Sequence, residues 1–518
     1  MIKILSVPQI RELDKKTIEQ KGMTSLRLME NAAEAFTERL VSDFPVFPDS
    51  FIHILCGTGN NGGDGLAVAR MLHSMNYRVR PYILRISDSE SKDFTANAKR
   101  ARKLFGKIKE VKTEEDLSGI KEGDIVIDAV FGTGLSRPLD KKWRDLLRVA
   151  STKGFTQISI DIPSGLFADK HTPETGFQAE FTVSFGHPKL AFMMPENQDE
   201  KGSWMVQGIG LDTQAIADAE TNNYFIQSDD VRGMLHDRSL HDHKGTYGHA
   251  LIIAGSYGKV GAAVLSSKAA LRTGAGLVTV HTPKCGYQIL QISFPEAMVQ
   301  PDQHEFLFSA HEDLSPYAAV GIGPGLGTNE VTVAAFEQFL KAVKQPLVID
   351  ADALNILAKN KKLFNLVPQN SILTPHPGEC RRLFGETKDS FERLELLREE
   401  AQKRKIFIIL KGGITTVLTP AGSAYFCSVG NPGMATGGTG DVLTGILTGL
   451  SAQGYTPIES CLLGVQLHGK AGDIAAEETE QEALLASDVI ACIGKAYAEL
   501  RKDEDDADIF EGDFFEEL

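Results

Sequence analysis

Hydrophobic and polar positions in the first half of the chain follow two alternating periods. Compact apolar runs at 51–56, 79–84, 124–130, 157–162, 181–185 and 205–209 are typical of buried strands. Residues 1–44 and 66–76 repeat their apolar positions every three or four residues, which predicts helices. In the first of these segments, the core-facing stripe is expected at Leu26, Leu28, Met29, Ala32, Ala33 and Phe36. This alternation predicts a parallel sheet covered by helices.

The apolar rhythm fades at 212–229, where polar residues dominate, and then resumes in a second β/α series. Its predicted strands are 249–254, 277–281, 318–323, 347–350, 371–374 and 407–410, followed by a hairpin of 415–418 and 425–428. Its predicted helices are 261–273, 331–343, 391–404, 441–453, 458–477 and 487–501. We therefore predict two α/β domains, 1–222 and 223–502, followed by an acidic tail at 503–518.

Composition narrows the class of protein. A chain of 518 residues with 42% hydrophobic and 24% charged residues is typical of a soluble protein of two or three domains. The net charge of −15, to which residues 501–518 contribute two basic and nine acidic side chains, argues against nucleic-acid or anionic-membrane partners. Six cysteines form no C-x-x-C pair, and the N-terminus turns charged too early for a signal peptide. These features predict a reduced cytoplasmic protein without a zinc site or a membrane span.

Residues 431–450, NPGMATGGTGDVLTGILTGL, join a Gly-rich loop to an amphipathic helix. Gly and Thr are poor helix formers, so the helix is expected to begin near Thr439. Its core-facing residues are Val442, Leu443, Ile446, Leu447 and Leu450. Free backbone N–H groups at such a helix start favour a phosphate. Asp441, in the first turn, either complements the helix dipole or accepts a proton from a hydroxyl that meets a phosphoryl group.

The segment 57–65, GTGNNGGDG, is predicted to be a loop between a strand and a helix. It contains G-x-G-x-x-G at Gly57, Gly59 and Gly62, which is a moderate dinucleotide signal. The loop is longer than a Rossmann fingerprint, and no acidic residue is clearly placed at the end of the second strand. Its additional polar residues are Asn60, Asn61 and Asp64. They either shape the turn, with Asp64 capping the following helix, or contact a ligand.

Two aspartates, Asp128 and Asp161, each end a predicted strand just before a Gly-bearing loop. Ligands of parallel sheets bind at the carboxyl ends of the strands, so these side chains are expected at one site. With Asn61 they either collect oxygen ligands around a hard cation or place a general acid/base beside a ligand. Lys189, in GHPKLA, supplies a positive partner.

The motifs NNGGDG, DAVFGTGL, DIPSG and HPKL, in this order, resemble the NAD(P)H-hydrate epimerase family. The resemblance implies that the hydrated nucleotide is held by Asn60, Asn61, Gly62, Gly63 and Asp64 and by Gly132, Thr133, Gly134, Leu135, Ser136, Arg137 and Pro138. It implies that Asp161 contacts the same ligand and is the acid/base at its hydroxyl-bearing carbon. It further implies a potassium ion bound by Asn61, Asp128 and Ser164. Residues 30–33, ENAA, resemble the family's N-terminal helix motif, with Ala33 where a glycine is more usual.

Four further loops of the second half accompany predicted strands. They are a Gly-rich turn within 243–263, GIGPGLG at 321–327, TPHPGE at 374–379 and LKGGIT at 410–415. His376 lies between two prolines, so it is not expected to be helical and is held rigid. A lone histidine is more often structural, and a lysine before two glycines, as at Lys411, is often a surface charge. Their occurrence at successive strand ends favours a shared site.

Together with GGTGD, these loops resemble the ADP-dependent NAD(P)H-hydrate dehydratases of the ribokinase-like superfamily, over 228–502. The resemblance implies that ADP, as co-substrate, contacts Lys411, Gly412, Gly413, Ile414, Thr415 and Gly440. It implies that the hydrated nucleotide contacts Ala262, Gly325, His376 and Asp441, and that Mg²⁺ accompanies the reaction. The implied fold is two three-layer α/β/α domains, with a Rossmann-like N-terminal sheet and a ribokinase-like C-terminal sheet.

The two resemblances span nearly the whole chain and imply a bifunctional enzyme that repairs NADH or NADPH hydrated at the C5–C6 bond. The N-terminal domain is expected to epimerise the R and S hydrates. The C-terminal domain is expected to dehydrate the S form with ADP, giving NAD(P)H, AMP and phosphate, with Asp441 as the base. A homo-oligomer is expected, because ribokinase-like relatives commonly assemble.

Two alternative functions stay open at this point. GGTGD alone does not separate a dehydratase from a small-molecule kinase, although TPHPGE and GPGLG favour the dehydratase. The N-terminal half is alternatively a non-catalytic nucleotide-binding module, against which the paired Asp128 and Asp161 argue. No residue decides between ADP and ATP, or between hydrated NADH and hydrated NADPH.

Overall fold

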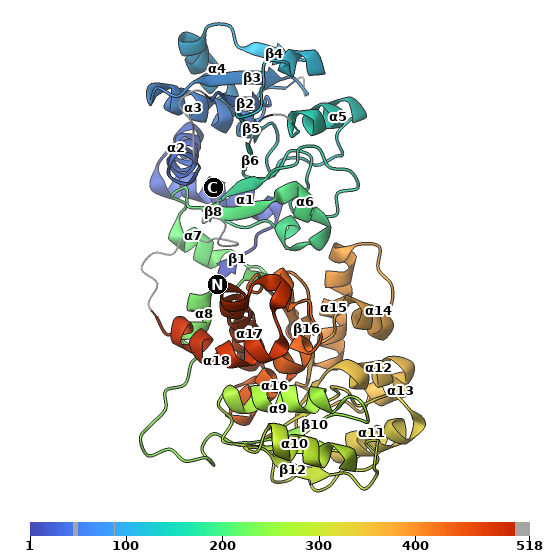
Figure 1. Cartoon of the computed structure of the whole chain (residues 1–518). Coiled ribbons are helices and arrows are strands. Elements are labelled where there is room, and N and C mark those ends of the chain that lie inside the picture. The colour runs from blue at the N-terminus through green and yellow to red at the C-terminus, as the bar shows by residue number, and fades with distance from the viewer. Residues whose placement is uncertain (45–49, 87–88, 153, 155, 503–518) are drawn as a thin grey trace. The chain divides into compact units, whose positions relative to one another are not determined.

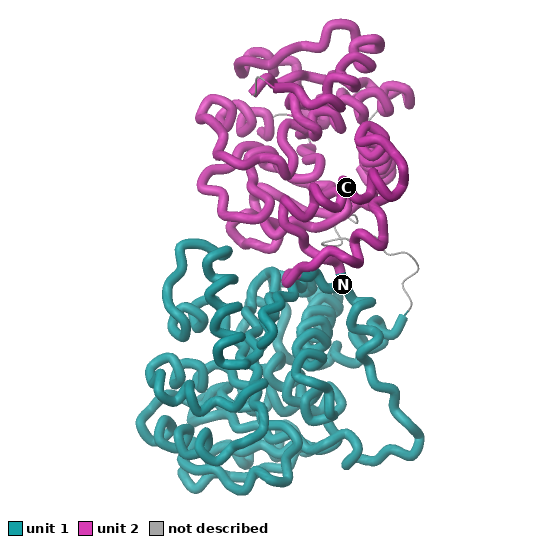
Figure 2. Tube along the Cα trace, turned by 180° about the vertical axis from the view of Figure 1, so that it is seen from behind, with its two compact units in different colours: residues 1, 224–505 teal, residues 2–223, 506–518 magenta. Residues whose placement is uncertain are grey.

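The computed structural model describes residues 1–44, 50–86, 89–152, 154 and 156–502. Two compact units share these residues: one is Ile2–Asn223, and the other is Met1 with the described residues from Tyr224 onward (Figures 1 and 2). The sequence places the division after residue 222, and the compact units divide after residue 223. The predicted acidic tail, 503–518, lies outside the described residues.

The N-terminal unit is built on a parallel sheet of order β4-β3-β2-β5-β6-β7-β8. Its strands are β2 (Ile52–Cys56), β3 (Val79–Leu84), β4 (Lys109–Val111), β5 (Ile125–Ala129), β6 (Thr156–Ile160), β7 (Phe181–Phe185) and β8 (Ser203–Gln207). The short strand β1 (Ile2–Lys3) precedes them. The predicted strands are confirmed, but β8 begins two residues earlier than expected and β4 escaped the sequence pattern because it is so short.

Alternating residues of these strands face two helix layers. Ile52, Ile54 and Cys56 pack with α2 (Ser25–Asp43), α3 (Asn60–Ser74) and α4 (Lys92–Phe105). Leu55 and Val126 pack instead with α5 (Lys141–Ala150). The remaining helices of the unit are α1 (Val7–Lys21), α6 (Gln198–Lys201) and α7 (Thr213–Asp218). The result is the predicted α/β/α arrangement around a sheet buried on both faces.

The predicted single helical segment 1–44 is two helices. Gly22 ends α1 in the left-handed conformation, with φ of 60°, and the Thr24 hydroxyl caps α2 by accepting from the Arg27 N–H. Glycine adopts the left-handed conformation at little energetic cost, so the chain turns at Gly22 and a new helix begins after it. The expected apolar stripe is buried in α2 at Leu28, Met29, Ala32, Ala33 and Phe36, whereas Leu26 is only half-buried.

The prediction that 57–65 is a loop and that the helix starts at residue 66 is wrong. Helix α3 begins at Asn60 and includes Gly62, Gly63 and Asp64. The glycines do not break this helix, because they let it pack closely: a Cβ at residue 62 would lie 1.9 Å from the Gly57 carbonyl oxygen. Tertiary packing therefore overrides the low helix propensity of glycine.

The C-terminal unit is built on a mixed sheet of order β9-β18-β17-β16-β15-β14-β13-β10-β11-β12. Its strands are β9 (Asn223–Phe225), β10 (His249–Ile253), β11 (Leu277–Thr282), β12 (Met298–Pro301), β13 (Ala319–Ile322), β14 (Leu347–Ile349), β15 (Ile372–Leu373), β16 (Phe407–Leu410), β17 (Thr415–Leu418) and β18 (Ala424–Cys427). The ladder is parallel from β12 to β16, and the predicted hairpin makes β16, β17 and β18 antiparallel. This is the expected ribokinase-like α/β sheet.

Helices of the C-terminal unit agree with the pattern to within two residues wherever one was predicted. They are α8 (Ser228–Arg232), α9 (Val260–Arg272), α10 (Tyr287–Ser293), α11 (Glu330–Ala342), α12 (Ala351–Lys359), α13 (Lys361–Phe364), α14 (Pro377–Phe384), α15 (Ser390–Arg404), α16 (Thr439–Ala452), α17 (Pro457–Thr479) and α18 (Ala486–Leu500). The core against α16 buries Val442, Leu443, Ile446, Leu447 and Leu450, as predicted. Among the described residues, no helix is long and apolar enough to cross a lipid bilayer.

Candidate active sites at the strand ends

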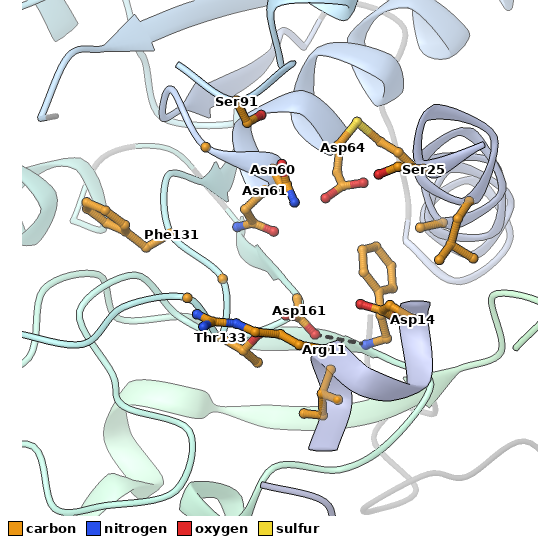
Figure 3. A pocket seen from close by; sticks show the side chains of 18 of the residues that line it. Arg11, Asp14, Ser25, Asn60, Asn61, Asp64, Ser91, Phe131, Thr133 and Asp161 are labelled. Carbon is orange, nitrogen blue, oxygen red and sulfur yellow. Dashed lines mark hydrogen bonds between the residues drawn. The ribbon is translucent and has the colours of Figure 1, made fainter. Parts of the chain in front are cut away.

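A cavity of about 780 Å³ lies at the carboxyl ends of the central strands of the N-terminal unit. Its lining includes the carboxyl groups of Asp14, Asp64 and Asp161, which Figure 3 labels, together with those of Glu19 and Glu90. Cationic side chains in the lining are those of Arg11, Lys15 and Lys189. Of the residues predicted from sequence, Asn60, Asn61, Asp64, Gly132, Thr133, Gly134, Leu135 and Asp161 line it. Gly62, Gly63, Ser136, Arg137 and Pro138 lie outside its lining.

Asp161 follows β6 and has a left-handed backbone, with φ of 69°. A non-glycine residue in this conformation stores about 1–3 kcal/mol of strain, which the surrounding contacts must hold. Its carboxylate lies 2.8 Å from the Nζ of Lys189 and accepts a hydrogen bond from the Phe185 N–H at 3.2 Å. Lys189 is only 1% exposed and also donates to the carbonyls of Phe185 and His187. The strand end therefore presents a charge-paired carboxylate to the cavity.

Asp64 occupies the second turn of α3 and does not cap that helix, because the N-cap is Gly59. The alternative that Asp64 is a capping residue is therefore wrong. Among the described residues, no hydrogen bond or ion pair reaches its carboxyl group, which is 9% exposed. Burial, together with the negative charges of Asp161 and Asp14, raises the pKa of Asp64 well above its usual range.

Asp128 lies beneath the cavity and is fully buried. Its carboxylate accepts hydrogen bonds from the N–H groups of Ser164 (2.7 Å) and Val130 (3.1 Å) and from the hydroxyls of Ser164 (2.6 Å) and Ser159 (3.1 Å). Within the described part of the chain no cationic side chain pairs with it, and burial raises its pKa to about 6. A buried carboxylate with only neutral partners suits a bound cation.

Asn61 completes the predicted cation ligands. Its Nδ2 donates to the Ile160 carbonyl at 3.3 Å, which leaves the amide oxygen toward Gly132, beside Asp161 (Figure 3). Asn61, Asp128 and Ser164 thus offer an amide, a carboxylate and a hydroxyl oxygen, the hard donors that an alkali or alkaline-earth cation takes. Their chemistry fits the predicted potassium ion.

Helix α1 contributes several cavity residues that the sequence pattern did not single out, among them Arg11 and Asp14. Burial and the neighbouring Asp161 raise the pKa of Asp14 to about 6, although Lys189 opposes this shift. The period of α1 shows only that one of its faces is buried. The sequence did offer one indication that Asp14 belongs to a site, because it places this carboxyl group on an otherwise apolar face of the helix.

The C-terminal candidate site surrounds the start of α16. Gly438, with φ of 100°, is the N-cap, and α16 begins at Thr439 as predicted. The Thr439 hydroxyl donates to the carbonyls of Met434 and Thr436, and the Nε2 of His468 lies 2.9 Å from the Thr439 carbonyl oxygen. These contacts fix the Gly-rich turn, so the first N–H groups of the helix are presented as a rigid anion-binding surface.

Asp441 stands in the first turn of α16 without a hydrogen-bonding partner among the described residues. Burial is the main cause that raises its pKa to about 6, and the negative charge of Asp350 adds to it, while Lys411 opposes it. A carboxylate that only complemented the helix dipole would be stabilised in its charged form. A carboxyl group with a pKa of about 6 is suited to exchange a proton near neutral pH.

The residues predicted to contact ADP meet beside this turn. Lys411 lies 2.9 Å from the Asp350 carboxylate, and a Cβ added to Gly440 would lie 3.4 Å from the Nζ of Lys411. Gly412, Gly413 and Ile414 form the turn between β16 and β17, and Thr415 begins β17. Asp350, at the end of β14, was not predicted as a site residue, although it ends a strand in the same way as Asp128 and Asp161.

The residues predicted to contact the hydrated nucleotide come from neighbouring loops. Gly325 packs against Ala262, and the Ser256 hydroxyl donates to the Gly325 carbonyl at 2.7 Å. His376 has an extended backbone, as predicted, and its Nδ1 accepts from the Gly378 N–H at the start of α14. The Lys411 N–H donates to the Pro375 carbonyl, which joins this loop to the ADP-contact residues.

Gly-rich turns and buried carboxyl groups at the carboxyl edges of both sheets define a fusion of two α/β enzyme domains that bind nucleotide-like ligands. The chain is 35% identical over 509 residues to the bifunctional NAD(P)H-hydrate repair enzyme Nnr of Moorella thermoacetica, covering 94% of this chain and 95% of that protein. It is 32% identical to the enzyme of the same name from Escherichia coli, covering 93% and 92%. The chain therefore belongs to the family of bifunctional NAD(P)H-hydrate repair enzymes.

Both domains of that family are present. Residues 25–191 match the family profile described as YjeF-related protein N-terminus, and residues 250–495 match that of the NAD(P)H-hydrate dehydratases. The N-terminal unit is thus the epimerase domain and the C-terminal unit the dehydratase domain. This excludes the two alternatives left open by the sequence, a small-molecule kinase and a non-catalytic N-terminal module.

Solved structures resemble the C-terminal unit. The ADP/ATP-dependent NAD(P)H-hydrate dehydratase of Bacillus subtilis, co-crystallised with ATP and Mg²⁺, is 31% identical with a TM-score of 0.48, covering 54% of this chain and all of that one. A ribokinase-like superfamily protein of Enterococcus faecalis is 28% identical with a TM-score of 0.49, covering 54% and 98%.

Proposed function

We propose that Asp161 moves the proton that allows inversion at the hydroxyl-bearing carbon of hydrated NADH or NADPH. The observation that carries this proposal is the buried Asp161–Lys189 ion pair, 2.8 Å long, at the floor of the 780 Å³ cavity. A carboxylate held in one place by strain and by a buried cation keeps a fixed position toward a bound ring. Proton transfer by a positioned group typically contributes about 10²–10⁴-fold to a rate.

The nucleotide parts of this substrate are proposed to lie along Asn60–Asp64 and Gly132–Pro138, the stretches that the resemblance indicates. Asn60, Asn61 and Gly132 to Leu135 support this by lining the cavity, whereas Ser136, Arg137 and Pro138 would have to contact a part of the ligand outside it. A potassium ion would be held by Asn61, Asp128 and Ser164. When bound, it would supply positive charge next to the buried Asp128 carboxylate and fix the loops that carry Asn61 and Ser164.

For the dehydratase domain we propose that Asp441 removes the proton of the substrate hydroxyl while that oxygen receives the terminal phosphoryl group of ADP. The start of α16, from Gly437 to Gly440, would bind the transferred group, and Lys411 would neutralise charge on the nucleotide. Hydroxide leaves poorly, whereas phosphate leaves easily. Loss of phosphate together with a proton from the neighbouring ring carbon then restores the double bond and gives NAD(P)H, AMP and phosphate.

The carrying observation for this step is Asp441 itself, an unpaired carboxyl group with a pKa raised to about 6, one turn from a helix N-terminus. Ala262, Gly325 and His376 are proposed to contact the hydrated nucleotide and Gly412 to Thr415 to contact ADP. Mg²⁺ is proposed to accompany the phosphate groups. Carboxylates available nearby are Asp350 and Asp352.

The experiment follows recovery of the NADH absorbance band from an equilibrated mixture of R and S hydrates, with ADP or with ATP. The proposal expects full recovery with ADP. Asp161→Ala is expected to stop recovery once the S fraction is used up, and Asp441→Asn to abolish recovery while ADP still binds. Recovery by Asp441→Asn at the normal rate, or a slower S-form reaction in Asp161→Ala, would contradict these roles.

We also propose a homo-oligomeric enzyme of a reducing compartment, the cytoplasm. All six cysteines are free thiols, and five of them are buried, which supports a reducing compartment. The oligomer rests on the resemblance alone. Light scattering of the purified full chain at several concentrations tests the assembly, and a monomer mass at every concentration would overturn it.

A further inference from the structure

Asp64 presents the epimerase cavity with a carboxyl group that no described residue contacts by a hydrogen bond or an ion pair. It comes from α3, whereas Asp161 comes from the end of β6 and is paired with Lys189. Figure 3 shows Asp64 and Asp161 entering the cavity from different walls. A buried carboxyl group without a partner is costly, so a fold that retains one in a cavity points to use of that group.

The epimerase reaction needs proton transfer on both faces of the ring. The hydroxyl-bearing carbon is bonded to the ring nitrogen, whose lone pair can form a C=N bond as the C–O bond breaks. The hydroxyl group takes a proton and leaves as water from one face. Water then adds to the same carbon from the other face, the C=N electron pair returns to nitrogen, and the added water loses a proton.

We propose that Asp64 is the second proton-transferring group of the epimerase and serves the ring face opposite the one served by Asp161. This inference rests on the proposed role of Asp161. In one direction the Asp64 carboxyl protonates the leaving hydroxyl, and the Asp161 carboxylate accepts the proton of the added water. The reverse direction uses the same two groups with their roles exchanged. When the enzyme turns over repeatedly in one direction, solvent takes the proton from Asp161 and returns one to Asp64.

The electrostatics of the two groups agree with this assignment. Burial holds the pKa of Asp64 well above its usual range, which favours the protonated form of this carboxyl group. Asp161 is instead paired with the buried ammonium of Lys189. Two carboxyl groups in such different surroundings, one buried without a partner and one paired with a cation, are the usual arrangement for an acid and a base in one site.

Asp14, Glu19 and Glu90 also line the cavity. Glu90 is paired with Arg85, and Asp14 and Glu19 both come from α1. Asp14 lies on the side of Asp161. Both Asp161 and Lys189 influence its pKa, and Figure 3 shows Asp14 close to Asp161. Asp14 therefore adds charge near Asp161, whereas Asp64 alone supplies a carboxyl group from the wall formed by α3.

The test measures inversion and oxygen exchange separately in the full-length enzyme. Purified R or S hydrated NADH is incubated in water enriched in oxygen-18, without ADP. Chromatography follows inversion, and mass spectrometry follows oxygen-18 entry into the hydroxyl group. The variants are Asp64→Asn and Asp161→Asn. Asp93→Asn is the matched control, because Asp93 also raises the pKa of Asp64 but does not line the cavity.

The expected result is that Asp64→Asn lowers the inversion rate by about 100-fold or more. It should still exchange oxygen in one epimer, because Asp161 can release and return water on its own face. Asp161→Asn should show the mirror pattern, with exchange in the other epimer, and Asp93→Asn should invert within about threefold of the normal rate.

Two results overturn the inference. One is inversion by Asp64→Asn at more than a tenth of the normal rate. The other is an equal fall of inversion and exchange for both epimers, which would mean that Asp64 only shapes the cavity. Normal inversion by Asp161→Asn would refute the proposed function itself, whereas an inactive Asp161→Asn beside a normal Asp64→Asn would refute only this inference. Unchanged S-form dehydration checks that each variant is folded.

Discussion

The Lys411 ammonium group lies 2.9 Å from the carboxylate of Asp350, and this ion pair stands beside the turn that carries Asp441. Asp350 also accepts a hydrogen bond of 2.9 Å from Thr444, one turn further along α16. The pair thus joins the ends of β14 and β16 to helix α16. Its two charges act on Asp441 in opposite directions: Asp350 raises the pKa of Asp441, and Lys411 lowers it.

Removing the charge of Asp350 and removing the charge of Lys411 should shift the pH profile of dehydration in opposite directions. Asp441 must be deprotonated to act as a base, so kcat should fall as the pH drops through about 6. Asp350→Asn removes a negative charge and lowers the pKa of Asp441, so the acid limb should move to lower pH by roughly one unit. Lys411→Met removes a positive charge and should move that limb to higher pH.

The measurement is kcat for the S hydrate at saturating ADP across the acid range. Saturation matters because Lys411→Met is also expected to weaken ADP binding. Lys403→Met, which removes a lysine paired with Glu400 on α15, serves as the control and should leave the limb in place. Shifts of the same sign in Asp350→Asn and Lys411→Met would contradict the role of Asp441.

Two glycines of the epimerase motif should differ sharply in their tolerance of a methyl group. A Cβ at residue 62 would lie 1.9 Å from the Gly57 carbonyl oxygen, whereas a Cβ at residue 59 would meet nothing within 4 Å. Gly62→Ala must therefore push α3 away from the β2 turn, at a cost of about 3 kcal/mol or more. Gly59→Ala is expected to change stability by less than about 1 kcal/mol.

Urea unfolding followed by tryptophan fluorescence measures this difference, because both tryptophans of the chain, Trp143 and Trp204, lie in the N-terminal unit. Gly62→Ala should also lose epimerase activity, since Asn61 and Asp64 move with the helix, and keep dehydration of the S hydrate. Equal stability of the two variants would show that the turn adapts to the added methyl group, which would contradict the close packing of Gly62 against Gly57.

The local pattern of apolar, glycine and polar residues predicted most strands and the start of α16, because residues close together in the sequence determine these features. Thr439 begins that helix where the Gly-rich run gives way to helical spacing, and the structure begins it there too. The same reasoning failed at Asn60. Gly62 and Gly63 read as a loop, yet close contacts with Gly57 and Met29 hold them in a helix.

Site residues brought in from distant segments could not be predicted from local pattern. Asp14 reaches the cavity because α1 covers the strand ends, a contact between segments far apart in the chain. Lys189 was recognised as a possible partner, but only the fold shows that it pairs with Asp161. Asp350 also ends a predicted strand, yet it was not predicted as a site residue. The residues that it contacts, Lys411 and Thr444, lie far away in the sequence.

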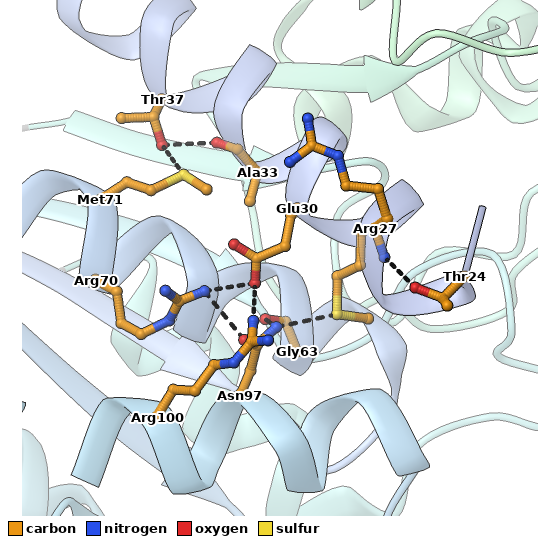
Figure 4. A network of polar contacts seen from close by, with 11 residues as sticks. Thr24, Arg27, Glu30, Ala33, Thr37, Gly63, Arg70, Met71, Asn97 and Arg100 are labelled. Atoms are coloured by element: carbon orange, nitrogen blue, oxygen red, sulfur yellow. Dashed lines mark hydrogen bonds and ion pairs between the residues drawn. The ribbon is translucent and has the colours of Figure 1, made fainter. Parts of the chain in front are cut away.

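A polar network behind the epimerase cavity should position its Asn-Gly stretch (Figure 4). The Glu30 carboxylate accepts from Arg70 at 2.5 Å and from Arg100 at 2.8 Å, and Arg70 also donates to Asn97. Asn97 in turn donates to the Gly63 carbonyl at 3.2 Å. Glu30→Gln weakens two charge-assisted bonds, so we expect kcat/KM for epimerisation to fall about 10-fold without an effect on dehydration.

Glu34→Gln is the matched control, because Glu34 lies on the same helix α2 but is exposed. Steady-state epimerisation of both variants is compared with their unfolding by urea. A fall in kcat/KM for Glu30→Gln with no loss of stability supports a positioning role for the network. Equal rates in Glu30→Gln and Glu34→Gln would mean that the stretch is held without it.

His468 should make the Gly-rich turn before α16 sensitive to acid. Its Nε2 lies 2.9 Å from the Thr439 carbonyl oxygen, and burial, with a smaller effect from Lys411, lowers its pKa to about 4. The unfolded chain binds a proton on this histidine near its ordinary pKa of 6.5, and the folded chain does not. Stability from His468 is therefore present above pH 6.5 and is lost as the pH falls toward 4.

From about pH 7.5 to about pH 5, this linkage amounts to roughly 2 kcal/mol. His468→Gln keeps a donor for Thr439 but does not titrate, so it should lose that much less stability over the same interval. Hydrogen exchange of the α16 and α17 amides, corrected for intrinsic rates, measures the difference, and the exposed His241→Gln should follow the unaltered protein. If His468→Gln and the unaltered protein lost protection in parallel, His468 would already be charged in the fold, and the turn that presents Asp441 would owe its acid sensitivity to another group.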